Sequence, residues 1–171
     1  MGEYSAASPY LKKALEISKK FLPPNHPNLA ALYNNMGDVF RSTGYYSPAV
    51  SHFEKAIEIL EKSLPHNHRD LVMSHSNIGE LLRNMREYSA ALSHLEKALG
   101  LQQKSVQSND FNLGILHDDI GSVYQSMQQH STALLHFEKA LEILRNYLPN
   151  NHDDLNRLYK NIQFCKSKHR L

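Results

Sequence analysis

The sequence predicts an all-α fold, an array of antiparallel helix pairs stacked along one axis. The stretch Tyr33–Phe40 returns 42 residues later as His75–Leu82, returns again as His117–Tyr124, and has a fainter copy at Tyr159–Phe164. A fixed period of this size is typical of stacked repeat proteins. Within each period, apolar residues recur at steps of three and four, which indicates amphipathic helices. These two observations predict a repeat array rather than a single globular core.

We expect the whole chain, residues 1–171, to form one array divided at its recurring loops. The expected elements are the second helix of a truncated repeat at 4–22, complete repeats at 27–64, 69–106 and 111–148, and the first helix of a partial or capping repeat at 153–168. Because the chain begins and ends within a repeat, we interpret it as part of a longer array.

The first helix of each repeat is predicted from an apolar stripe, which in the first repeat is Leu29, Leu32, Tyr33, Met36 and Phe40. Pro27 suits the first turn of this helix, where a missing N–H costs no hydrogen bond. Gly44 is expected to end the helix, because glycine adopts the left-handed conformation of a helix terminus without steric cost.

The second helix of each repeat is predicted to begin at a serine N-cap, with Ser47 in the first repeat and Ser5, Ser89 and Ser131 at the equivalent positions. Its apolar stripe in the first repeat is Val50, Phe53, Ile57, Leu60 and Leu64. Pro65 is expected to end the helix, because proline disfavours helix at the residue before it. We interpret His66 and His68, which follow, as turn and capping residues.

Small residues recur where the two helices of a repeat are expected to cross. Gly37 lies on the first helix, and Ala49 and Ala56 lie on the second. We expect a larger side chain at any of these positions to force the helices apart, at a cost of roughly 1–3 kcal/mol.

The junction at 106–111 departs from the other loops. It lacks their Leu-Pro-x-Asn-His pattern, and it lies between Gly100 and Gly114. Each glycine is expected to cost its helix roughly 1 kcal/mol of stability. We therefore predict that this is the loosest junction of the array, with Asp110 capping the next helix.

Composition limits the function classes. The chain is 21% charged and 41% hydrophobic, with a formal net charge of +2, so neither nucleic acid nor an anionic membrane is an expected partner. Cys165 is the one cysteine, which excludes an intrachain disulfide. No stretch has the roughly 18 apolar residues of a membrane helix. We expect a cytoplasmic (intracellular) protein without a cofactor.

The repeated positions resemble the tetratricopeptide repeat. They are Gly37, Tyr46, Ala49 and Ala56 in the first unit, Gly79, Tyr88, Ala91 and Ala98 in the second, and Gly121, His130, Ala133 and Ala140 in the third, where histidine replaces the tyrosine. The 42-residue unit is longer than the usual one of about 34 residues. It is similar to the kinesin light chain type of this repeat, chiefly at Leu22–Pro27 and Tyr33–Gly37. Pro65 and Pro149 stand where that type usually has glycine.

This resemblance implies a right-handed superhelical solenoid whose first helices line a concave groove for a protein or peptide partner. The candidate groove residues that it implies are Asn34, Asn35, Asp38, Arg41, Met73, Ser76, Asn77, Glu80, Arg83, Asp118, Asp119, Ser122, Gln125, Lys160 and Asn161, with Ala31, Ile115 and Arg157 beside them.

Asn35 and Asn77 are the sharpest candidates for partner binding. An amide side chain offers both a donor and an acceptor, as the clamping of an extended peptide backbone requires. The polar residues of this face could instead be solvated, or form pairs at i,i+3 such as Asp38–Arg41 and Glu80–Arg83. Because Asp38 and Glu80 occupy the column of the second asparagine of the carboxylate-clamp repeat, we predict that acidic chaperone tails do not bind.

Catalytic and metal sites are not predicted. His52, His94 and His136 recur in one column, but neighbouring helices lie about 8–10 Å apart, too far for a shared metal. Cys165 has His169 four residues on, in a terminal helix without an oriented site.

The sequence therefore predicts a non-enzymatic interaction module that binds a peptide segment in its groove. An alternative is a structural spacer or a self-association segment that acts through open array ends. An RNA-binding role ranks last, since the expected inner face has few aromatic or basic residues.

Overall fold

The structure, a computed structural model, describes residues 2–63, 69–104 and 110–168, and the side chains within them except those of residues 2–8 and 110. Within these ranges every regular element is a helix. The helices are α1 (Gly2–Phe21), α2 (Pro27–Ser42), α3 (Tyr46–Ser63), α4 (Arg69–Asn84), α5 (Tyr88–Lys104), α6 (Asp110–Ser126), α7 (His130–Leu144) and α8 (Asp153–Lys168). None of them is long and apolar enough to cross a lipid bilayer.

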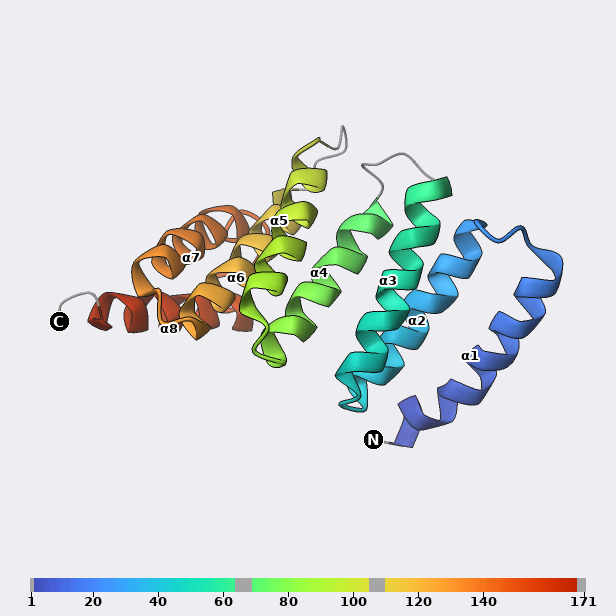
Figure 1. The fold of residues 1–171 in the computed structure, drawn as a ribbon. Helices are drawn as coiled ribbons and strands as arrows, with labels where there is room; N and C mark the ends of the chain where they lie inside the picture. The colour runs from blue at the N-terminus through green and yellow to red at the C-terminus, as the bar shows by residue number, and fades with distance from the viewer. Residues whose placement is uncertain (1, 64–68, 105–109, 169–171) are drawn as a thin grey trace.

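The helices form a right-handed superhelical solenoid of antiparallel pairs, as predicted. Each helix packs against the next in the chain, most extensively within the pairs α2–α3, α4–α5 and α6–α7. Helix α4 also contacts α6 directly. As a result α1 and α8 lie at opposite ends of the array (Figure 1).

Close contact between paired helices depends on the small residues that the sequence repeats. A Cβ atom added at Gly37 would lie 2.8 Å from the ring of Phe53, and one at Gly79 would lie 2.5 Å from Cγ of Leu95. Gly121 faces Phe137 in the same way, at 2.8 Å. The predicted crossing of the two helices at these positions is confirmed.

Gly114 has a packing role that the sequence analysis does not assign to it. A Cβ atom there would lie 2.7 Å from Cγ of Leu144, so the glycine allows α6 to approach α7. Gly100, in contrast, has no atom within 4 Å of such a Cβ position. The predicted looseness of the junction at 106–111 and the capping by Asp110 concern groups outside the described residues.

The predicted serine N-caps are wrong. The first intrahelical hydrogen bonds of α3, α5 and α7 are accepted by the carbonyl groups of Tyr45, Glu87 and Gln129, two residues before the predicted serines. These serines therefore lie inside the first turns, and Ser5 lies inside α1. The reason is the preceding turn, in which the N–H of Tyr45 donates to the carbonyl of Phe40 (2.9 Å) and redirects the chain before the serine is reached.

Gly44 adopts the left-handed conformation that was predicted, with φ of 81°. The same position of the next two repeats is occupied by Arg86 (φ 65°) and Gln128 (φ 61°). Side chains with a Cβ are strained in this conformation. The turn geometry is therefore retained in all three repeats, although only the first has the favourable residue.

Histidine caps two of the first helices. Nδ1 of His26 accepts from the backbone N–H of Asn28, and Nδ1 of His152 accepts from that of Asp154, both at 3.2 Å. Pro27 lies in the first turn of α2, as predicted. The loop with His66 and His68 lies outside the described residues.

Candidate functional site

The first helices of successive repeats form the inner layer of the solenoid. Side-chain hydrogen bonds connect α2 with α4, α4 with α6, and α6 with α8. Within the described ranges, no such bond connects α3, α5 and α7 to one another. We call α2, α4, α6 and α8 the inner layer, because their side chains join successive repeats and α4 contacts α6 directly.

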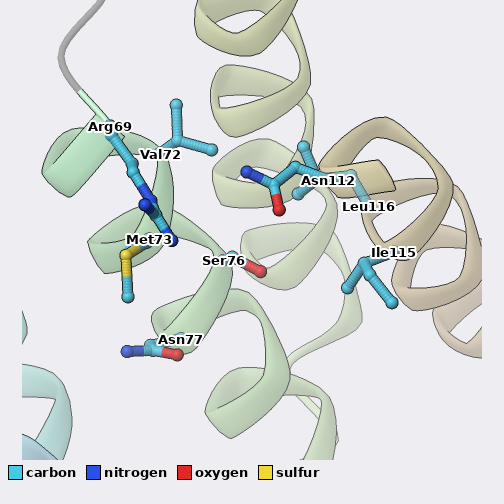
Figure 2. A pocket seen from close by; sticks show the side chains of 8 residues that line it. All are labelled: Arg69, Val72, Met73, Ser76, Asn77, Asn112, Ile115 and Leu116. Atoms are coloured by element: carbon cyan, nitrogen blue, oxygen red, sulfur yellow. The ribbon is translucent and has the colours of Figure 1, made fainter. Parts of the chain in front are cut away.

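A pocket of about 180 Å³ opens in this layer between α4 and α6. Figure 2 shows α4 and α6 placing side chains on opposite sides of it. Its lining combines an apolar wall with amide, hydroxyl and guanidinium groups, and consists of Arg69, Val72, Met73, Ser76, Asn77, Asn112, Ile115 and Leu116.

Three predicted groove residues, Met73, Ser76 and Asn77, line this pocket. Met73 is 49% exposed, so its apolar surface is accessible from solvent. Arg69 and Asn112 were not among the predicted residues. They lie one helical turn before Met73 and Ile115, so extension of the same helix face by one turn finds them.

The adjacent residues Asn34 and Asn35 have different surroundings. Asn34 is half-buried, and its Oδ1 accepts a hydrogen bond from Oγ of Ser74 on α4 at 3.0 Å. Asn35 is exposed. Asn34 therefore joins two repeats, and Asn35 keeps its amide available to a partner.

Arg41 is shared between two carboxylates. Its guanidinium lies 3.1 Å from Asp38 on the same helix and 3.0 Å from Glu80 on α4. The Asp38–Arg41 pair considered at i,i+3 is present. The Glu80–Arg83 pair is not, because Glu80 turns toward Arg41 of the preceding repeat, and Arg83 makes no ion pair with any described residue.

A second shared guanidinium lies at the α8 end of the inner layer. Nη2 of Arg157 on α8 lies 2.6 Å from Oδ2 of Asp118 and 3.1 Å from Asp154. Asp118 is only 3% exposed, and its Oδ1 has no hydrogen-bond partner within the described structure. Burial raises the pKa of Asp118, and the charge of Arg157 opposes that rise.

Asp119 faces α4 instead of α8. Its Oδ2 accepts a hydrogen bond from Oγ of Ser76 at 3.3 Å. Burial raises the pKa of Asp119 to about 7, and the charges of Asp118 and Glu80 add to the rise. A carboxyl group with this pKa is partly protonated at neutral pH.

The remaining predicted residues lie away from the pocket between α4 and α6. Ser122, Gln125 and Asn161 are half-buried and do not line it. Lys160 is exposed and borders a separate hollow along α8 together with Arg157 and Tyr159.

Two close histidine pairs lie between the helices of the second and third repeats. Nδ1 of His75 is 3.0 Å from Nδ1 of His94, and Nδ1 of His117 is 3.1 Å from Nδ1 of His136. The sequence analysis did not predict these pairs. A signal was present, because His75 and His117 occupy one repeat position and His94 and His136 occupy another. His52, in the first repeat, contacts the rings of Tyr33 and Phe40 instead. Within the described ranges no three His, Cys, Asp or Glu side chains gather as metal ligands would.

Cys165 is fully buried, and burial raises the pKa of its thiol. A raised thiol pKa reduces the thiolate that a nucleophilic role requires. His169, its suggested neighbour, lies outside the described residues.

The fold and the polar inner layer define a helical repeat protein, a class whose curved surfaces receive partners. The sequence profile described as Tetratricopeptide repeat matches residues 1–62 and 70–146, and the chain belongs to that family. Repeats of this family generally mediate protein–protein interactions, and proteins built from them are generally non-enzymatic. No curated protein sequence matches the chain.

Solved structures with the same fold include kinesin light chain-like repeats, which confirms the resemblance to that type. BtubC (BKLC) from P. vanneervenii is 18% identical with a TM-score of 0.86, over 98% of this chain and 67% of that one. A Podosopora anserina protein described as a kinesin light chain with nearly identical TPR-like repeats is 19% identical with a TM-score of 0.80, over 98% and 80%. The apo form of RapI is 17% identical with a TM-score of 0.86, over 99% of this chain and 59% of RapI.

Proposed function

We propose that this protein binds an extended peptide segment of a partner protein along its inner layer, with the pocket between α4 and α6 as the central contact. The observation that carries this proposal is the pocket itself. It lies on the layer where a curved repeat array receives its partners, and its lining is mixed in character. Binding sites typically combine such an apolar wall with a few placed polar groups.

Asn77 and Asn35 supply the backbone recognition in this proposal. Asn77 lines the pocket, and Asn35 is exposed on the equivalent face of α2. Each amide can donate to a peptide carbonyl and accept from a peptide N–H, whatever side chains the peptide carries. Met73 and Ile115 offer apolar area for one side chain of the peptide.

The test is a selection of binders from a random peptide library, followed by affinity measurements with synthetic peptides by fluorescence anisotropy. The double variant Asn35→Ala/Asn77→Ala is expected to weaken binding by about tenfold or more, which corresponds to the loss of two hydrogen bonds. Gln103→Ala removes an exposed amide from the outer helix α5 and serves as the matched control.

Helicity and melting temperature of all variants, measured by circular dichroism, separate loss of binding from loss of fold. Selected peptides that bind both variants as tightly as the wild type would show that the groove is not their site. That result would contradict the proposal, and so would a selection that enriches no peptide.

A second candidate is self-association, because α1 leaves two aromatic side chains uncovered. Tyr10 is 77% exposed and Phe21 is 80% exposed. A second copy of the chain could cover them. Sedimentation velocity over a range of concentrations tests this role. A dimer is expected for the wild type and a monomer for Tyr10→Ser/Phe21→Ser. A wild-type chain that stays monomeric would exclude self-association.

A further inference from the structure

A second pocket, of about 400 Å³, opens between α1 and α3, which belong to the outer layer formed by α1, α3, α5 and α7. Helix α2 lies between α1 and α3 and packs against both (Figure 1). The buried side chains of Leu29 on α2 and Ile59 on α3, with the half-buried Leu22 beside them, give the pocket an apolar floor. None of its lining residues lines the pocket between α4 and α6.

Three lysines and one glutamate are the charged groups of the lining. Glu58 is shared by two of the lysines, since its Oε2 accepts from Nζ of Lys55 at 2.5 Å and its Oε1 accepts from Nζ of Lys62 at 2.8 Å. These hydrogen bonds lower the pKa of Glu58 to about 2, so it is ionised at neutral pH. Lys19 makes no ion pair with any described residue, and its Nζ lies 5.4 Å from the centroid of the Tyr33 ring. The lining therefore has two positive charges in excess.

This excess remains when the charged residues beside the pocket are counted. Residues 9–63, which include the described side chains of α1 and all of α2 and α3, contain seven lysine and arginine residues and five aspartate and glutamate residues. Glu54 and Glu61, the other carboxylates of α3, do not line the pocket. The neighbourhood of the pocket is therefore as basic as its lining.

The sequence brings three lysines together at this junction of the array and not at the next two. There, the positions of Lys19 and Lys62 are occupied by other combinations, Glu61 with Lys104 and Gln103 with Asn146. Because the same helix packing forms with these residues, the fold does not require lysine at either position. The charges of Lys19 and Lys62 are therefore available for binding a ligand.

The ammonium groups have more hydrogen-bond donors than Glu58 accepts from. Each lysine offers three N–H donors, and the two lysines beside Glu58 each use one of them on it. A phosphoryl group on a side chain has three acceptor oxygens and a charge of about −1.5 to −2 at neutral pH. It matches the excess charge of the lining, whereas a single carboxylate would neutralise half of it. The apolar floor suits the carbon atoms that carry such a group.

We propose that the pocket between α1 and α3 binds one phosphorylated side chain of a partner protein, with Lys19, Lys55 and Lys62 around the phosphoryl group. A protein is the favoured source of this group, because repeats of this family generally mediate protein–protein interactions. The inference goes beyond the proposed function, since the site lies on the other layer and does not need a peptide in the groove.

Fluorescence anisotropy with two labelled peptide mixtures tests this inference. Each mixture has random residues on both sides of one fixed position, which is phosphoserine in the first and phosphotyrosine in the second. Counterpart mixtures have the unphosphorylated residue. At least one phosphorylated mixture is expected to bind the wild-type protein about tenfold more tightly than its counterpart, as for charge-assisted hydrogen bonds. Added sodium chloride should reduce this preference, because salt screens exposed charges.

The double variant Lys19→Gln/Lys62→Asn removes two charges and introduces the residues that the equivalent positions have at the junction of α5 and α7. The preference for the phosphorylated mixture should be lost, with helicity by circular dichroism unchanged. Lys13→Gln/Lys104→Asn is the matched control, because both lysines are exposed, neither lines the pocket, and the net charge changes equally. It should retain the preference.

Glu58→Gln gives a test that does not depend on loss of binding. It frees one donor each of Lys55 and Lys62, so the phosphorylated mixture should bind about threefold more tightly than it does to the wild type. A variant that had merely lost its fold could not show this gain. An affinity that stays the same or falls would contradict the site.

Equal affinity of the wild type for phosphorylated and unphosphorylated mixtures would overturn the proposal, and so would a preference that survives Lys19→Gln/Lys62→Asn. Inorganic phosphate that displaces the labelled mixture as effectively as the unlabelled mixture does would also overturn it, because the site would then bind the free anion. Asn35→Ala/Asn77→Ala should leave the preference unchanged, so this site and the groove are tested separately.

Discussion

The Nδ1 atoms of His75 and His94 lie 3.0 Å apart between α4 and α5, and the pair His117 and His136 repeats this contact at 3.1 Å between α6 and α7. Such a contact requires one ring to donate and the other to accept, so at least one ring of each pair must be neutral. Burial lowers the pKa of His75 and of His117 to about 4, and it also lowers the pKa of His94 and of His136. The pairs therefore connect the two helices of a repeat only when they are largely uncharged.

Acidification is expected to weaken these two repeats. A histidine with a lowered pKa in the fold contributes stability that is fully present above its unfolded pKa of about 6.5 and is lost as the pH falls toward 4. Tyr33 occupies the position of His75 in the first repeat, so His75→Tyr/His117→Tyr removes both pairs with a residue that this column accepts. Melting temperatures at pH 7.5 and 4.5 should differ less in this variant than in the wild type. His52→Gln is the control, and equal pH dependence of all three proteins would contradict the role of the pairs.

Two glycine substitutions are expected to have opposite effects. Gly79→Ala places a Cβ atom 2.5 Å from Cγ of Leu95, and we expect it to destabilise the fold by about 1–3 kcal/mol through overpacking. Gly100→Ala meets no atom within 4 Å and should stabilise α5 by about 0.5–1 kcal/mol, because alanine restricts the unfolded chain. Urea denaturation measures both. If both variants changed the free energy of unfolding in the same direction, close packing against Leu95 would not be the reason for glycine at position 79.

Replacing the left-handed residues after α4 and α6 by glycine is expected to stabilise the fold. Arg86→Gly and Gln128→Gly each remove a strained backbone conformation, and the gain should exceed the added entropy of the unfolded glycine by up to about 1 kcal/mol. Gly44→Ala, at the equivalent position of the first repeat, should lose about 1 kcal/mol. Thermal unfolding of the three variants checks the order, and a stabilised Gly44→Ala would refute the assignment of strain.

Loss of Arg157 is expected to destabilise the fold more than loss of Arg41. Arg157→Met leaves the buried carboxylate of Asp118 without its cation, at a cost of about 1–3 kcal/mol. Arg41→Met releases Asp38 and Glu80, which are each about 40% exposed and can be hydrated, so the loss should stay below about 1 kcal/mol. Chemical denaturation at pH 7.5 compares them. A larger loss for Arg41→Met would mean that burial of Asp118 does not control the outcome.

Much of the fold could be predicted from the sequence because its signals are local and repeated. The spacing of the apolar residues indicates the helices, and Gly37 with its equivalents indicates where they cross. The start of α3 could not be predicted correctly, since serine followed by proline suits both an N-cap and a first turn. The hydrogen bond from Tyr45 to Phe40 decides between these possibilities, and that bond depends on the turn geometry.

The candidate site was predicted as a helix face, but not as a set of contacts. The resemblance to the tetratricopeptide repeat predicted Met73, Ser76 and Asn77 as groove residues, and their spacing of three and one residues places them on one side of α4. It does not reveal that Glu80 pairs with Arg41 rather than with Arg83, because the distance along one helix says nothing about the rotation of its neighbour. The histidine pairs were missed for the same reason, since residues 19 positions apart meet only across a helix crossing.

The sequence by itself determined that this chain is a tetratricopeptide array, because each repeat encodes its own helices and its own small contact residues. Only the tertiary structure decided which side chains of the inner layer are used in joining repeats and which remain available. Asn34 is bonded to Ser74, whereas Asn35 is exposed and Asp119 receives one hydrogen bond, from Ser76. The physical reason is that the pairing of polar groups depends on the angle between successive first helices, which the packing of whole repeats determines.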